Sequence, residues 1–359
     1  MIFLHSSFRT SSTWMWDCFR KLSGVTAYCE VFNEALASLK KSEVNATSHS
    51  SWFSNHPVGA PYFQEFTPLI TDPGGVAGYD RTMSFGRFIP EDGIHGDISK
   101  GEKEYLASLI AHADELGTIP VLSCTRTLGR LPALKRALPG LHILIYRNLF
   151  RQWCSYTEQY AQGNKYFFHT IRACLDNSSH DGFCRHLKET FRLEDPRIDS
   201  REFFCAFVLL HTYLYAQVAD SADVIFDIER AVADKDYGKL MEDEIRSRSG
   251  LPVDLSGIKA RIGFSILDSE CTLELKHTIK VLAETAISMA PSAAGRQFAF
   301  KVLSDLMEEW DKYSFYAGTL STIAGQRGLL DARDTLVPSA KQDSVSRVAR
   351  ILRRLRQWK

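Results

Sequence analysis

Hydroxyl side chains gather around one arginine near the start of the sequence, in the segment HSSFRTSSTWMW from His5 to Trp16. Arg9 carries a permanent charge in a planar group that can bind two oxygens at once. Four hydroxyl residues follow it without a gap: Thr10, Ser11, Ser12 and Thr13. Because the residues before and after this turn predict a strand and a helix, whose amino terminus favours anions, we expect the turn to bind phosphate. The alternative is that the hydroxyls cap the helix and Arg9 lies on the surface.

The turn differs from the phosphate loop of ATP- and GTP-binding proteins. That loop follows the pattern GxxxxGK[ST] and needs a lysine for the β and γ phosphates. Here the turn contains no Gly-Lys pair, and the charged residue precedes the hydroxyl run. We therefore expect an anion other than ATP.

A second arginine and a serine eight residues later form another candidate anion site, in the segment LIYRNLFRQWCSY from Leu144 to Tyr156. Arg147 stands where an apolar strand is predicted to end, and Ser155 falls within the helix predicted next. Ligands of open α/β sheets bind outside the carboxyl ends of the strands. Arg147 and Ser155 are thus placed to reach one phosphate from two directions, although arginine after a strand and serine in a helix are both common.

Short apolar runs alternate with helical patterns over the first two thirds of the chain. We predict strands at residues 2–5, 26–32, 119–124, 142–146 and 222–228. We predict helices at residues 13–22, 33–42, 100–115, 131–138 and 149–159, a mainly helical stretch at 165–220, and further helices to about residue 325. This order is typical of an α/β fold with a central parallel sheet flanked by helices and, here, a helical C-terminal part. Residues 46–96 are predicted to form long loops.

The composition excludes several classes of protein. The chain of 359 residues has no formal net charge, whereas general nucleic-acid binders carry a basic excess. We find no run of eighteen apolar residues, so we expect no membrane span. We also expect no signal peptide, because the start of the sequence leaves no room for one. The histidines show no HxxxH or HExxH pair, so we expect no zinc site. The eight cysteines show no CxxC spacing. We expect reduced thiols and a cytoplasmic protein.

Together, RTSSTW (Arg9 to Trp14) and RNLFRQWCS (Arg147 to Ser155) resemble the two signatures of sulfotransferases that use 3′-phosphoadenylyl sulfate (PAPS). The first signature runs basic, hydroxyl, Gly, hydroxyl, hydroxyl, aromatic, and the second has serine eight residues after arginine. The resemblance covers roughly residues 2–42 and 100–260. It favours the bacterial and carbohydrate-acting branch and implies a P-loop-NTPase-like sulfotransferase fold, with PAPS as donor, adenosine 3′,5′-bisphosphate as product and no metal.

The resemblance also implies roles for single residues. Arg9 would contact the 5′-phosphosulfate and steady the leaving oxygen, and Trp14 would stack on or wall off the adenine. The hydroxyl residues Thr10, Ser11, Ser12 and Thr13 would surround the phosphosulfate. Arg147 and Ser155 would hold the 3′-phosphate. The chain departs from the family at Ser11, where glycine is usual, and it lacks the glycine-rich RKG segment of the phenol and steroid enzymes.

A general base is the remaining catalytic requirement, and Glu30 is the first candidate. It follows Arg9 by 21 residues, about where carbohydrate sulfotransferases carry a glutamate in a Phe-Glu-Pro motif, although Val31 replaces the proline here. Glu34 and His5 are weaker alternatives. Burial in a cleft can raise a carboxyl pKa toward useful base strength. The structural alternative is that Glu30 pairs with a nearby arginine.

We expect a single sulfotransferase domain over residues 1–330, with acceptor-side insertions at 46–96 and 157–220, and a tail at 331–359. Arg126 and Arg130 follow a predicted strand and either contact the ligands or pair with the protein's own carboxylates. The acceptor would be a carbohydrate or a lipid-linked sugar. The basic amphipathic segment 344–359 either docks on its own domain or contacts a membrane or partner. The alternative functions are a P-loop-related nucleotide kinase and a non-catalytic nucleotide-binding protein.

Overall fold

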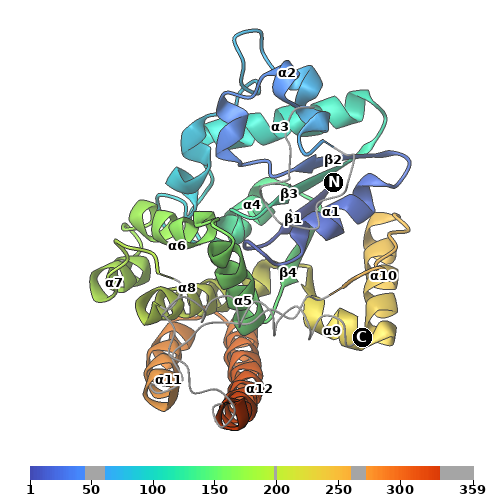
Figure 1. Cartoon of the computed structure of the whole chain (residues 1–359). Coiled ribbons are helices and arrows are strands. Elements are labelled where there is room, and N and C mark those ends of the chain that lie inside the picture. Colours follow the sequence, from blue (N-terminus) through green and yellow to red (C-terminus); the bar gives the residue numbers. More distant parts are fainter. Residues whose placement is uncertain (45–60, 198–199, 260–271, 332–359) are drawn as a thin grey trace. The chain divides into compact units, whose positions relative to one another are not determined.

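The computed structural model describes residues 1–44, 61–197, 200–259 and 272–331 of the chain. Contacts divide the chain into two compact units, Met1–Trp310 and Asp311–Lys359. The first unit contains a five-stranded sheet with helices around it (Figure 1). The basic segment 344–359 lies outside the described residues, as does the first part, 46–60, of the predicted loops at 46–96.

The sheet is parallel throughout, with the strand order β2-β3-β1-β4-β5. The strands are β1 (Ile2–His5), β2 (Val25–Cys29), β3 (Ile119–Cys124), β4 (Leu141–Tyr146) and β5 (Val224–Asp227). Every residue of β1 and β4 is buried, as expected for parallel strands covered on both faces. The predicted α/β class with a central parallel sheet is confirmed. Because β1 pairs with both β3 and β4, the residues after these three strands meet at one edge.

Helices make up most of the rest of the described chain. They are α1 (Ser12–Arg20), α2 (Lys41–Val44), α3 (Lys100–Glu115), α4 (Leu131–Ala137), α5 (Leu149–Ala161), α6 (Tyr166–Asn177), α7 (Gly182–Thr190), α8 (Arg201–Val218), α9 (Ile228–Ala233), α10 (Lys235–Ser249), α11 (Thr272–Ser288) and α12 (Ala293–Asp331). Short 3-10 turns include η1 (Glu34–Ala37), η4 (Arg81–Met83) and η5 (Phe85–Arg87). One described helical stretch, Arg201–Ser221, is long and apolar enough to cross a membrane, but 94% of its apolar window is buried inside the protein.

Most predicted elements have the expected type, and one helix does not form as predicted. The predicted helix at 33–42 is replaced by the 3-10 turn η1 and by the short α2. The backbone N–H groups of Gly75 and Val76 donate to the carbonyls of Leu39 and Leu36. In an α-helix over 33–42 the Leu36 carbonyl would instead accept from the backbone N–H of Lys40, so contacts from a distant segment override the local pattern.

Arg130 is one of the two arginines that were expected to contact ligands or protein carboxylates, and the structure buries it completely. Its Nη1 donates to Glu102 Oε1 at 2.7 Å and to the Met83 carbonyl at 2.8 Å, and its Nη2 donates to the Ser84 carbonyl at 2.7 Å. Its guanidinium lies 4.4 Å from the ring centroid of Phe32. Arg130 therefore ties the segment around η4 to α3 and β3.

We predict that Arg130→Met lowers the free energy of unfolding by about 3–5 kcal/mol, because the buried Glu102 carboxylate loses its counter-ion. Chemical denaturation checks this. Arg248→Met is the control, since Arg248 pairs with Glu244 on the surface of α10 and such pairs contribute about 1 kcal/mol or less. Equal losses for the two variants would show that the buried arginine has no special structural role.

Candidate functional site

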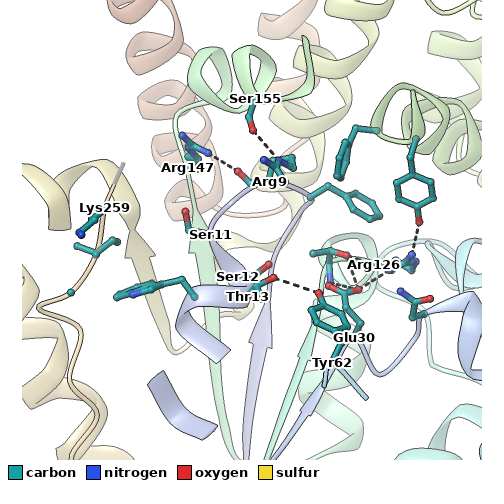
Figure 2. Close-up of a pocket in the computed structure, with 18 residues that line it drawn as sticks. Arg9, Ser11, Ser12, Thr13, Glu30, Tyr62, Arg126, Arg147, Ser155 and Lys259 are labelled. Atoms are coloured by element: carbon teal, nitrogen blue, oxygen red, sulfur yellow. Dashed lines mark hydrogen bonds and ion pairs between the residues drawn. The ribbon is translucent and has the colours of Figure 1, made fainter. Parts of the chain in front are cut away.

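A cavity of about 360 Å³ lies over the carboxyl ends of the strands. Its lining comes from the segments that follow β1, β2, β3 and β4 and from a loop after α10. The lining residues are Phe8, Arg9, Ser11, Ser12, Thr13, Trp14, Glu30, Asn33, Tyr62, Thr125, Arg126, Arg147, Ser155, Tyr166, Phe167, Gly257, Ile258 and Lys259. Figure 2 shows Lys259 on one side of the cavity and Arg126 with Glu30 on the other. The location is the one that parallel α/β sheets use for ligands.

The hydroxyl turn after β1 lines the cavity, with one exception. Arg9 and the residues from Ser11 to Trp14 face it, whereas Thr10 is buried and its hydroxyl donates to the Ser7 carbonyl at 2.8 Å. Thr10 therefore stabilises the turn and does not line the cavity. No side chain caps the amino terminus of α1, and its first turn holds no acidic residue. The alternative in which the hydroxyls serve as helix caps is not what this structure shows.

Three non-glycine residues of the described chain have a positive φ, and all three line this cavity. They are Arg9 and Ser11, each at φ 63°, and Glu30 at φ 53°. A left-handed backbone costs an L-residue about 1–2 kcal/mol, and such strain gathers at functional sites. Ser11 stands where the signature that the turn resembles usually has glycine. Glycine adopts this conformation without a Cβ penalty.

The two predicted anion sites meet in this cavity. Arg9 Nε donates to Ser155 Oγ at 2.9 Å, and Arg147 Nη1 donates to the Arg9 carbonyl at 2.9 Å (Figure 2). Arg9 also lies over the ring of Phe167, 5.1 Å from its centroid. Arg147 is paired with Glu229 at 3.3 Å. The contact arises because β1 and β4 are neighbours, so the residues that follow them leave the sheet side by side.

Glu30 follows β2 directly, and its side chain is buried at the cavity wall. Its Oε2 accepts from Arg126 Nη1 at 2.6 Å and from Thr125 Oγ1 at 2.8 Å. Its Oε1 accepts only a longer bond, 3.3 Å from the Thr125 backbone N–H. Burial raises the pKa of Glu30, and Arg126 and Thr125 offset part of that rise. Glu30 is therefore both paired with an arginine and available to accept a proton at Oε1.

The two weaker base candidates are placed differently. Neither Glu34 nor His5 lines the cavity. Burial raises the pKa of Glu34, but the Arg126 charge and hydrogen bonds from Tyr166 and Ser84 outweigh it, so the pKa is lowered overall. His5 is fully buried, where burial and His142 lower its pKa, and it bonds to His142 at 2.9 Å. The geometry favours Glu30.

Several lining residues had no recognised sequence signal. Phe8, Asn33 and Thr125 flank motif residues, whereas Gly257, Ile258 and Lys259 come from the far part of the chain. Tyr62, Tyr166 and Phe167 fall within the predicted acceptor-side insertions at 46–96 and 157–220. The sequence does hold one signal for residues 257–259. A glycine stands two residues before a lysine there, in a loop that follows α10.

Comparisons with models of protein families, with curated proteins and with solved structures give no match to this chain.

We predict that Ser11→Gly raises the free energy of unfolding by up to about 1 kcal/mol, because glycine relieves the left-handed strain at this position. Thermal or chemical denaturation checks this. Ser12→Gly is the matched control: Ser12 is the first residue of α1, where glycine should lower stability. If both variants lose stability alike, the turn does not store the strain that its backbone indicates.

Proposed function

We propose that the chain is a sulfotransferase that moves the sulfuryl group of PAPS to a hydroxyl or amine of a carbohydrate or glycolipid-like acceptor. The observation that carries the proposal is the convergence of Arg9, Ser155 and Arg147 on one cavity. A donor with phosphates at both the 3′ and 5′ positions of one ribose needs two anion sites of this kind in one cavity. A P-loop-NTPase-like sulfotransferase fold is consistent with a parallel sheet whose central strand leads into the hydroxyl turn.

In this proposal each end of the donor has its own set of residues. The 5′-phosphosulfate lies at the uncapped amino terminus of α1, where Arg9, Ser11, Ser12 and Thr13 supply charge and donors. The 3′-phosphate takes Arg147 and Ser155. The adenine lies against Trp14, which packs on Phe226 with ring centroids 6.5 Å apart. Lys259, from the loop after α10, adds a positive charge on the same side.

The proposed transfer is a direct displacement at sulfur. The acceptor oxygen forms a bond to sulfur while the bond from sulfur to the bridging oxygen breaks. That oxygen leaves with the 5′-phosphate of adenosine 3′,5′-bisphosphate, and the acceptor proton passes to Glu30. Arg9 stabilises the charge that develops on the leaving oxygen. The raised pKa of Glu30 brings its base strength closer to what the proton transfer needs.

We predict that Arg147→Ala weakens adenosine 3′,5′-bisphosphate binding by about tenfold to a hundredfold, as expected for a lost charge-assisted hydrogen bond. The affinity for adenosine 5′-phosphate, which lacks the 3′-phosphate, should fall much less. Calorimetric titration of both nucleotides checks this. Arg151→Ala is the control, because Arg151 also pairs with Glu229 but does not line the cavity. Equal weakening of both nucleotides by Arg147→Ala would contradict the assignment.

We predict that Glu30→Gln lowers kcat by a factor on the order of 10²–10⁴, the usual contribution of a general base, and leaves bisphosphate affinity unchanged. Sulfuryl transfer from radiolabelled PAPS and nucleotide titration measure the two quantities. Because Glu30 must be ionised to act and its pKa is raised above 4.5, wild-type kcat/KM should fall on acidification at a pH above that value.

The residual kcat/KM of Glu30→Gln should not show this fall on acidification. Wild-type protein that binds the bisphosphate but transfers nothing to any acceptor would favour a non-catalytic binding protein. Turnover of ATP in place of PAPS would favour a nucleotide kinase. A variant as active as wild type would remove Glu30 from the mechanism.

A further inference from the structure

Positively charged side chains are distributed unevenly around the cavity, and its two sides are formed by different residues. Lys259 lies on one side, Arg9 and Arg147 lie along its top, and Arg126 lies on the other side with Glu30 (Figure 2). The first three cations are the ones that the proposed function assigns to the donor. What remains around Glu30 is the part of the cavity open to an acceptor. Its charge therefore bears on which acceptors can enter.

Arg126 is the only cation among the lining residues on the Glu30 side, and it is already paired with two carboxylates. Its Nη1 donates to Glu30 at 2.6 Å, and its Nη2 donates to Glu34 and to Tyr166 Oη, each at 2.7 Å. The side chain is 2% exposed. Two carboxylates thus surround one guanidinium, and Glu34 keeps its negative charge because its pKa is lowered. A further anion here would meet an excess of negative charge.

The same side of the cavity carries three aromatic rings. Phe8, Tyr166 and Phe167 all line it. Their ring centroids lie 6.2 Å (Phe8 to Tyr166), 6.3 Å (Phe8 to Phe167) and 5.6 Å (Tyr166 to Phe167) apart, each pair in edge contact. Such a wall packs against the C–H face of a sugar or against another ring. The Tyr166 hydroxyl already donates to Glu34 Oε1 at 2.8 Å, and the rings supply no positive charge to pair with a carboxylate or a sulfate.

Asn33 supplies a neutral polar group beside this wall. Its Oδ1 accepts from the Ala35 backbone N–H at 2.9 Å, and the side chain is buried at the cavity wall. That bond fixes the amide, so Nδ2 remains as a donor to an acceptor oxygen. Together with Glu30 Oε1, the site presents one neutral donor and one proton acceptor. This pair suits a hydroxyl group.

From the charge balance and the aromatic wall we infer that the acceptor is an uncharged alcohol with an apolar ring face, such as a neutral sugar, and that anionic sugars are excluded. The inference rests on the proposed function and narrows it. Arg126, held between Glu30 and Glu34, contributes to selectivity by leaving no spare positive charge on the acceptor side.

Matched acceptor pairs test the inference. p-Nitrophenyl glucoside and p-nitrophenyl glucuronide differ by a hydroxymethyl group and a carboxylate, and the galactoside and galacturonide form a second pair. With PAPS as donor, we expect kcat/KM for each neutral member to exceed that of its acid by about tenfold or more, because like charges in a desolvated site repel each other. Equal rates, or faster transfer to the acids, would overturn the inference.

A single substitution probes the charge balance itself. Glu34→Gln removes one carboxylate outside the cavity lining. The ratio of kcat/KM for the glucoside to that for the glucuronide should therefore fall several-fold, while the affinity for the bisphosphate stays unchanged. Glu104→Gln is the control, because Glu104 is an exposed residue of α3 that pairs with Lys100. A discrimination ratio unchanged in Glu34→Gln would show that these carboxylates do not set acceptor charge.

Binding measurements separate this inference from the proposed function. Acceptor binding to the protein saturated with adenosine 3′,5′-bisphosphate is followed by saturation-transfer NMR, which needs no turnover. Neutral glycosides should bind and the acids should not. If the bisphosphate binds but no neutral glycoside does, the acceptor inference is wrong while the donor site stands. If the bisphosphate itself does not bind, the proposed function fails.

Discussion

The hydrogen bond from Arg147 to the carbonyl of Arg9 is the interaction on which the candidate site depends. It joins the segment after β4 to the turn after β1, in which Arg9 adopts a left-handed conformation that an L-residue does not favour. The adjacency of the two strands in a parallel sheet makes this bond possible. With Arg9 so placed, its guanidinium reaches Ser155 on α5. Two segments almost 140 residues apart thereby line one cavity, which we propose as the site of both phosphates.

Charged side chains are distributed unevenly over the cavity. Arg9, Arg147 and Lys259 face the region that we propose for a bisphosphorylated nucleotide. The fourth cation, Arg126, is balanced by Glu30 and Glu34 and lies within 5.1 Å of the ring centroids of Phe8 and Phe85. Burying such a group without its carboxylates would be costly, so the arginine and its partners form one unit. In the proposed mechanism, the same unit positions Glu30 for proton transfer.

Local patterns predicted the strand at 119–124 and the helix at 100–115 with the bounds that the structure has. Those patterns are strong because the elements are apolar or regularly amphipathic. Spacing within one turn or one strand–helix unit also indicated Arg9, Arg147 and Ser155. What the sequence could not predict depends on distant contacts. The pairing of Glu30 with Arg126 spans 96 residues, the loop at 257–259 reaches the cavity only through folding, and distant backbone bonds replace the helix at 33–42.

A crystal structure of the protein with adenosine 3′,5′-bisphosphate would test the central claim most directly, because it locates both phosphates at once. The account predicts the 3′-phosphate within hydrogen-bond distance of Arg147 and Ser155, and the 5′-phosphate at the amino terminus of α1 beside Arg9. It also predicts adenine against Trp14. A nucleotide bound elsewhere, or bound here with only one phosphate held by these residues, would contradict the account.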